Sequence, residues 1–166
     1  MSVYATILLL SAIVIIQTTA MPHLTILGAK PDLVLLMVIS WSLLRGAKEG
    51  LIWALIGGIG LDLVSGAPFG TSTVALAVLS LLAGRGELSV FRTHIALPLI
   101  AILIATLTYD LFFLFLLHMK GYAIVWTDSL TKVVLPSTLG NVLLSPLVYK
   151  ALYWLNRKTG PEEMAW

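Results

Sequence analysis

One stretch of 34 residues, from Leu51 to Gly84, contains no Lys or Arg. Its one acidic residue is Asp62. As one helix it would be about 51 Å long, whereas the hydrocarbon core of a bilayer is about 30 Å thick. A break is expected at Ser65-Gly66-Ala67-Pro68-Phe69-Gly70, because Gly and Pro interrupt helices. The stretch therefore predicts two short helices whose connection is shielded by other protein, since lipid cannot satisfy a loop backbone.

Composition points to the same environment. Hydrophobic residues make up 59% of the 166 residues and charged residues 11%, against about 25% charged in soluble domains. The mean hydropathy is +1.01. Cysteine is absent, which excludes disulfides and Cys nucleophiles, and a dispersed net charge of +2 argues against a nucleic-acid partner. We therefore expect one domain, residues 1–166, inserted in a bilayer with membrane lipid around it.

Apolar segments predict an all-α integral membrane protein, a compact bundle of six transmembrane helices at about residues 3–21, 31–44, 51–65, 69–84, 96–117 and 136–155. Pro146 is expected to kink the last helix. Because six is an even number of spans, both termini are expected on the same side of the membrane. Seven of the ten Lys and Arg residues would lie on that side and three on the other, so the positive-inside rule predicts cytoplasmic termini.

Polar side chains within the apolar segments are the candidate site residues. A lone carboxylate such as Asp62 costs about 2.5 to 3.5 kcal/mol near the centre of a membrane helix, so a partner must compensate it. Asp110 and Asn141 fall at a similar level of the predicted bundle. The hypothesis is a polar cluster of Asp62, Asp110 and Asn141 in the outer half of the bundle. The alternative is that each Asp caps the adjacent loop or faces a water-filled depression.

Small residues and Asp62 recur every four positions along one ridge, at Gly50, Ala54, Gly58, Asp62 and Gly66, with Gly57 and Gly60 beside it. This spacing lets another helix backbone approach closely, so the third helix is expected to pack centrally in the bundle. The two tryptophans of the second and third helices, Trp41 and Trp53, are expected to pack between helices rather than to lie in an interfacial belt.

Enzyme sites fit the sequence poorly, so we expect neither catalysis nor a cofactor. The segment from Gly58 to Asp62 and the pair Tyr109-Asp110 are similar to the motifs of intramembrane aspartyl proteases, but their order is reversed. Ser65 lacks a base at a suitable position in the sequence. The histidines fall near span ends without the spacing of metal ligands, at His23, His94 and His118.

A family resemblance is carried by four pieces of the chain: Pro31 to Leu36, Arg45-Gly46 with Gly50, Gly57 to Asp62, and the loop motif containing Ser65, Gly66, Pro68 and Gly70. These pieces cover about a third of the chain, and they resemble the rod shape-determining protein MreD family of bacteria.

The resemblance implies a non-catalytic, multi-pass inner-membrane scaffold of the machinery that elongates peptidoglycan and helps to set rod shape. Its direct partner would be MreC, with RodA and a class B penicillin-binding protein reached through the complex and MreB indirectly. The family is also similar in helix arrangement to the S-components of energy-coupling-factor transporters. The alternative function is therefore a vitamin-binding S-component, although the short outer loops offer few groups to hold a ligand.

Overall fold

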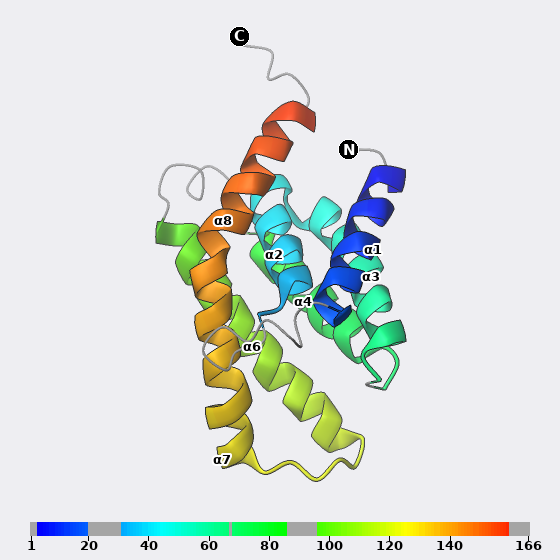
Figure 1. Ribbon diagram of the computed structural model, residues 1–166, viewed down its shortest axis with the longest axis vertical. Helices are drawn as coiled ribbons and strands as arrows, with labels where there is room; N and C mark the ends of the chain where they lie inside the picture. Colours follow the sequence, from blue (N-terminus) through cyan, green and yellow to red (C-terminus); the bar gives the residue numbers. More distant parts are fainter. Residues whose placement is uncertain (1–2, 20–30, 67, 86–95, 160–166) are drawn as a thin grey trace.

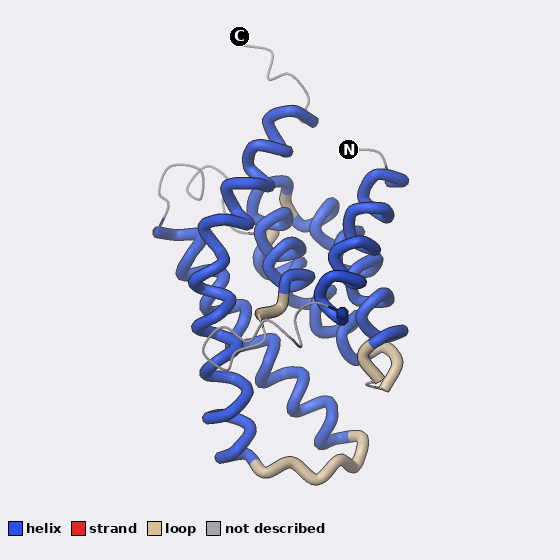
Figure 2. The backbone as a smooth tube through the Cα atoms, in the orientation of Figure 1, coloured by secondary structure: helices blue, strands red, loops and turns tan. Residues whose placement is uncertain are grey.

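The computed structural model describes residues 3–19, 31–66, 68–85 and 96–159, and this part of the chain is helical without any β-strand (Figure 2). The predicted all-α class is confirmed. The first helix begins and the last helix ends at the same end of the molecule, called here the terminal end (Figure 1). Residue Ala67 of the loop motif lies outside the described residues.

The helices are α1 (Val3–Thr19), α2 (Leu33–Arg45), α3 (Ala47–Val64), α4 (Thr71–Ala83), α6 (Ala96–Met119), α7 (Trp126–Ser129), the π-helical turn η1 (Leu130–Val134) and α8 (Leu135–Thr159). The predicted boundaries of the first five segments agree with these to within four residues. The helix that contains the last predicted span, residues 136–155, begins earlier, at Trp126.

Two prolines in the long helix from Trp126 to Thr159 explain its local geometry. Pro136 cannot donate a backbone hydrogen bond and its ring crowds the carbonyl of Lys132. Directly before it, the backbone widens into η1, where the N–H of Leu135 bonds to the carbonyl of Leu130. Pro146 likewise deprives the carbonyl of Val142 of a donor, and the Ser145 hydroxyl supplies one at 2.7 Å. The helix therefore continues through both positions.

The centre of the bundle is α2, and the expectation that the third helix is central was wrong. Residues 34–44 of α2 are all buried, and α2 contacts α1, α3, α4, α6 and α8. A helix that is apolar on every side is stable only when it is surrounded. Helix α3, by contrast, leaves a stripe of apolar side chains exposed, such as Leu63 at 71%.

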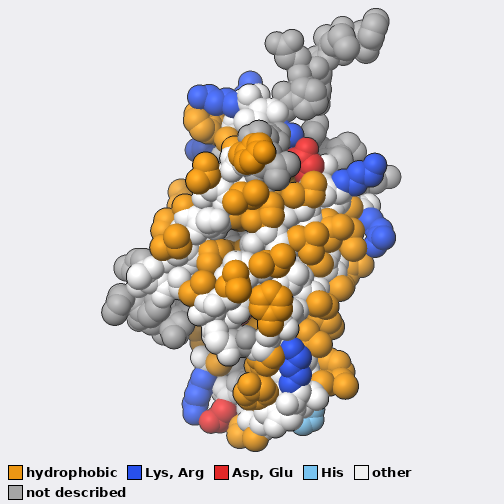
Figure 3. Space-filling view, turned by 90° about the vertical axis from the view of Figure 1, so that its right-hand side faces the viewer, with side chains coloured by type: hydrophobic (Ala, Val, Ile, Leu, Met, Phe, Trp, Pro, Cys, Tyr) orange, Lys and Arg blue, Asp and Glu red, His pale blue; other side chains and the backbone are white. Residues whose placement is uncertain are grey.

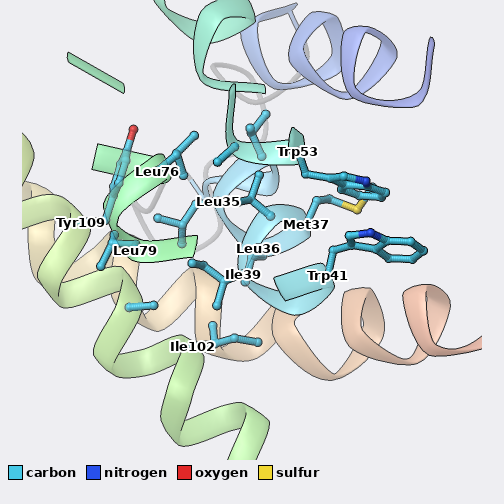
Figure 4. Close-up of a cluster of buried hydrophobic side chains, with 14 of the residues drawn as sticks. Leu35, Leu36, Met37, Ile39, Trp41, Trp53, Leu76, Leu79, Ile102 and Tyr109 are labelled. Carbon is cyan, nitrogen blue, oxygen red and sulfur yellow. The ribbon is translucent and has the colours of Figure 1, made fainter. Parts of the chain in front are cut away.

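Buried side chains of α2 meet those of α4 and α6 in one apolar cluster (Figure 4). Leu35, Leu36 and Ile39 are fully buried there. At the terminal end, the rings of Trp41 and Trp53 stack with centroids 4.4 Å apart, so both pack between helices as expected.

The outer surface is apolar between two charged ends (Figure 3). Within the described residues, two helices are long and apolar enough to cross a membrane, Pro98–Met119 and Trp126–Thr159. Shorter apolar helices accompany them at Tyr4–Thr19, Leu33–Arg45 and Thr71–Ala83.

Candidate functional site

Asp62, the carboxylate in the last turns of α3, is 5% exposed and is fully engaged by the start of α4. It accepts hydrogen bonds from the backbone N–H groups of Gly70 at 3.0 Å, Ser72 at 2.8 Å and Thr73 at 3.1 Å. The hydroxyl of Thr73 donates a fourth bond at 2.6 Å. Asp62 thus acts as an N-cap supplied by a neighbouring helix, because Gly70 itself has no side chain to cap α4.

The loop motif between α3 and α4 places these donors. Gly66 and Gly70 have φ angles of 68° and 92°, a left-handed region that glycine adopts without strain. The carbonyl of Pro68 accepts bonds from the backbone N–H of Thr71 at 3.2 Å and from its hydroxyl at 2.6 Å. The chain therefore reverses tightly and delivers the positive end of the α4 dipole to the Asp62 carboxylate.

Asn141 and Asp110 connect the first turns of α8, the part far from the terminal end, to α6 and to the start of α2. The side-chain oxygen of Asn141 accepts a bond from the Asp32 N–H at 2.7 Å, and its amide donates to the Thr106 hydroxyl at 3.4 Å. One turn away along each helix, the Ser137 hydroxyl donates to the Asp110 carboxylate. Polar pairs thus link α6 and α8 at two successive levels.

Gln17 and Asp32 extend this polar seam to α1, although the sequence interpretation gave Gln17 no role. The Gln17 amide donates to the Asp32 carboxylate at 3.0 Å, and its oxygen accepts the Val34 N–H at 2.9 Å. Asp32 also caps α2 by accepting the Leu35 N–H at 2.9 Å. A lone amide in an otherwise apolar helix was the available sequence signal.

The three predicted cluster residues therefore belong to two hydrogen-bonded groups rather than one. Asp62 closes the loop beside it, as the alternative interpretation proposed, while Asp110 and Asn141 lie in the seam between α6 and α8. The hydrogen-bond donors at the start of α4 satisfy the Asp62 carboxylate locally.

Tyr109, which the sequence interpretation did not assign to the site, directly precedes Asp110 on α6. It is 6% exposed, and its hydroxyl points away from the apolar leucines (Figure 4).

The small residues of α3 face three different helices. A Cβ atom added to Gly58 would lie 2.5 Å from the Cα atom of Thr73 on α4. One added to Gly50 would lie 1.9 Å from the Ser42 hydroxyl oxygen of α2. The remaining positions contact α2 and α1: Gly57 meets Val34, and Gly60 meets Val14 at 3.0 Å, while Ala54 is fully buried. These contacts set how closely the helices approach.

Arg45 organises the terminal end of the bundle. Its guanidinium donates to Asn156 at 2.6 Å and to Thr159 at 2.9 Å, which ties the end of α2 to the end of α8. It also pairs with Glu49 at 3.2 Å, and Glu49 accepts the indole N–H of Trp41 at 3.0 Å. From the sequence, Arg45 enters only the charge count and the family resemblance, and none of these contacts could be read from it.

Arg45→Lys is expected to lower the stability of the protein by about 1 to 3 kcal/mol, because one ammonium group cannot reach all three partners of the planar guanidinium. Thermal unfolding in detergent measures the effect. Arg157→Lys is the matched control, since Arg157 is exposed in the same region, and it should leave the unfolding temperature unchanged. Equal shifts in the two variants would contradict the assigned role of Arg45.

Metal-binding geometry is not found in the part of the chain that the structure describes, where no group of three His, Cys, Asp or Glu side chains could hold an ion. His118 packs edge-on against Trp126 with centroids 6.0 Å apart. His23 and His94 lie outside the described residues.

The outer surface is apolar, and polar side chains form pairs where helices contact one another. These features are those of a helical, membrane-associated protein. The family model described as rod shape-determining protein MreD matches residues 1–158, so the chain belongs to that family. The family resemblance is thereby confirmed, and with it a role in rod shape determination within a structural family that is not a known enzyme family. No curated protein and no solved structure matches the chain.

Proposed function

We propose that the protein is a non-catalytic membrane scaffold of the machinery that elongates peptidoglycan, and that it binds the transmembrane helix of MreC directly. RodA, a class B penicillin-binding protein and MreB would be reached through that complex. Family membership supports the process, and one structural observation supports the scaffold role. The buried carboxylates and amides described above are engaged by groups of the chain itself, as the four bonds to Asp62 illustrate.

Partner binding would then use the apolar outer faces. On α8, Leu139, Leu143 and Leu147 recur every four residues and are 61 to 70% exposed, which forms a continuous stripe along one side. Lipid tails are as apolar as leucine, so hydrophobicity alone does not favour binding of a partner helix to this stripe. Such a helix would bind through complementary shape and close packing. The rigid seam between α6 and α8 would hold the stripe in a fixed position.

The proposed arrangement in the membrane is six spans in the bacterial inner membrane with both termini in the cytoplasm. The described basic residues support this orientation, because they gather at the terminal end: Arg45, Lys48, Arg85, Lys150, Arg157 and Lys158 lie there or in the adjoining turns. At the opposite end, the described basic side chains are those of Lys120 and Lys132. A positive excess of this kind is typical of the cytoplasmic side.

Site-specific photo-crosslinking tests the proposed contact. A photoreactive amino acid at Leu143 is expected to capture MreC in growing cells, and the same residue at the buried position Leu36 should capture nothing beyond the chain itself. Placing the probe at Leu63 of α3 and Leu8 of α1 examines the other two apolar faces. Absence of MreC adducts from every lipid-facing position would contradict a transmembrane contact.

A further inference from the structure

A groove of about 470 Å³ lies between α6 and α8 in the half of the bundle nearer the terminal end, and no function has been assigned to it above. Its walls are apolar at the bottom and polar at the mouth. We call it the α6–α8 groove, defined by Pro98, Ile102, Pro146, Tyr149, Lys150 and Tyr153.

The groove stays open because no long side chain crosses its floor. Ile102 is fully buried, and the Ser145 hydroxyl is turned to the Val142 carbonyl of its own helix. Pro98 and Pro146 contribute short rings on opposite walls. The floor is therefore a surface on which hydrocarbon can lie.

Lys150 gives the mouth of the groove a positive charge that the rest of the structure does not use. Among the described residues it forms no ion pair or hydrogen bond, and it is the basic side chain that lines the groove. Nearby, Arg45 pairs with Glu49, and Lys158 lies 4.0 Å from the ring of Trp154. Tyr153 lies beside Lys150 on the same helix and is 40% exposed. A cation and phenol groups next to an apolar channel match an anion attached to a hydrocarbon chain.

The groove is too small for a packed helix and suits a single acyl chain of a lipid as its occupant. A helix about 10 Å wide occupies roughly 420 Å³ per turn of about 5.4 Å, so the groove could seat about one turn. A volume of about 470 Å³ is within the usual range of roughly 300 to 1,000 Å³ for small-molecule sites.

We propose that the α6–α8 groove binds one anionic phospholipid, with the phosphate at Lys150 and an acyl chain along the floor towards Ile102. Binding does not depend on the proposed scaffold role. Only the assignment of the lipid to the cytoplasmic leaflet depends on the proposed orientation.

Native mass spectrometry of the full chain, purified from bilayers of equal parts phosphatidylglycerol and phosphatidylcholine, tests this proposal. The expected result is retention of one phosphatidylglycerol in at least fivefold excess over phosphatidylcholine. Lys150→Gln should remove this preference, while the matched control Lys48→Gln, at an exposed lysine in the same half of the bundle, should preserve it. Equal retention of the two lipids, or equal effects of the two substitutions, would overturn the proposal.

Leu99→Trp provides a second test that does not depend on charge, because Leu99 lines the groove and a larger ring would fill it. This variant should lose the bound lipid while its unfolding temperature, measured without added lipid, stays that of the wild type. Lipid retention in the filled variant would contradict the location. Capture of a protein helix instead of lipid by the wild type, lost in Leu99→Trp, would overturn the assignment of the occupant.

Discussion

Gly58→Leu is expected to prevent the protein from folding. Even the Cβ atom of an alanine at this position would lie 2.5 Å from the Thr73 Cα atom and 3.0 Å from its nitrogen, and a backbone cannot move aside as a flexible side chain can. Overpacking of this kind typically costs about 1 to 3 kcal/mol, which we expect for Gly58→Ala. For Gly58→Leu, size-exclusion chromatography of membrane extracts should yield no monodisperse protein.

The matched control for this substitution is Ala12→Leu, which enlarges a small residue on the exposed face of α1. It should be recovered at wild-type levels with an unchanged unfolding temperature. Recovery of Gly58→Leu at the same level and stability would show that α3 and α4 do not cross as closely as described.

Asp62→Leu is expected to cause the second large loss of stability. It removes the acceptor of four hydrogen bonds and leaves unpaired the N–H groups of Gly70, Ser72 and Thr73 at the start of α4, where Ser72 is buried and the other two are partly buried. Each unpaired buried group costs about 1 to 3 kcal/mol, so the sum should exceed the effect of any surface substitution. Thermal unfolding in detergent, together with restoration of rod shape in cells that lack the protein, measures the outcome.

Asp62→Asn should have an intermediate effect. The amide oxygen can occupy the position of Oδ2, which accepts from Gly70 and from both donors of Thr73. The amide nitrogen would then face the Ser72 N–H, a donor that now bonds to Oδ1, so that bond is lost. Asp128→Asn is the control, because its exposed pair with Lys132 is worth at most about 1 kcal/mol. A ranking in which Asp62→Leu is as stable as the wild type would contradict the capping role.

The parts of this fold that could be predicted from sequence are those with a local cause. The break at residues 65–70 follows from the limits that Gly and Pro set on helices, and the helices on both sides end close to where the pattern indicated. The four-residue spacing of Gly50, Ala54 and Gly58 likewise identified a face on which other helices pack.

The features that sequence could not supply depend on three-dimensional neighbours. A carboxylate within an apolar helix requires a partner, but the pattern cannot say that Asp62 meets backbone N–H groups of the next helix while Asp110 meets Ser137. The sequence pattern places the start of the last span at about Pro136. A π-helical turn accommodates it within a longer helix, which no local rule predicts.

Purification of the tagged protein from its native membrane, with identification of its partners by mass spectrometry, tests the scaffold proposal most directly. We expect recovery of MreC together with RodA and a class B penicillin-binding protein, with recovery of MreC reduced when the stripe residue Leu143 is replaced by a bulkier Trp. Recovery of an ATPase pair with a coupling membrane subunit, and no MreC, would contradict the scaffold and favour a vitamin-binding component of a transporter.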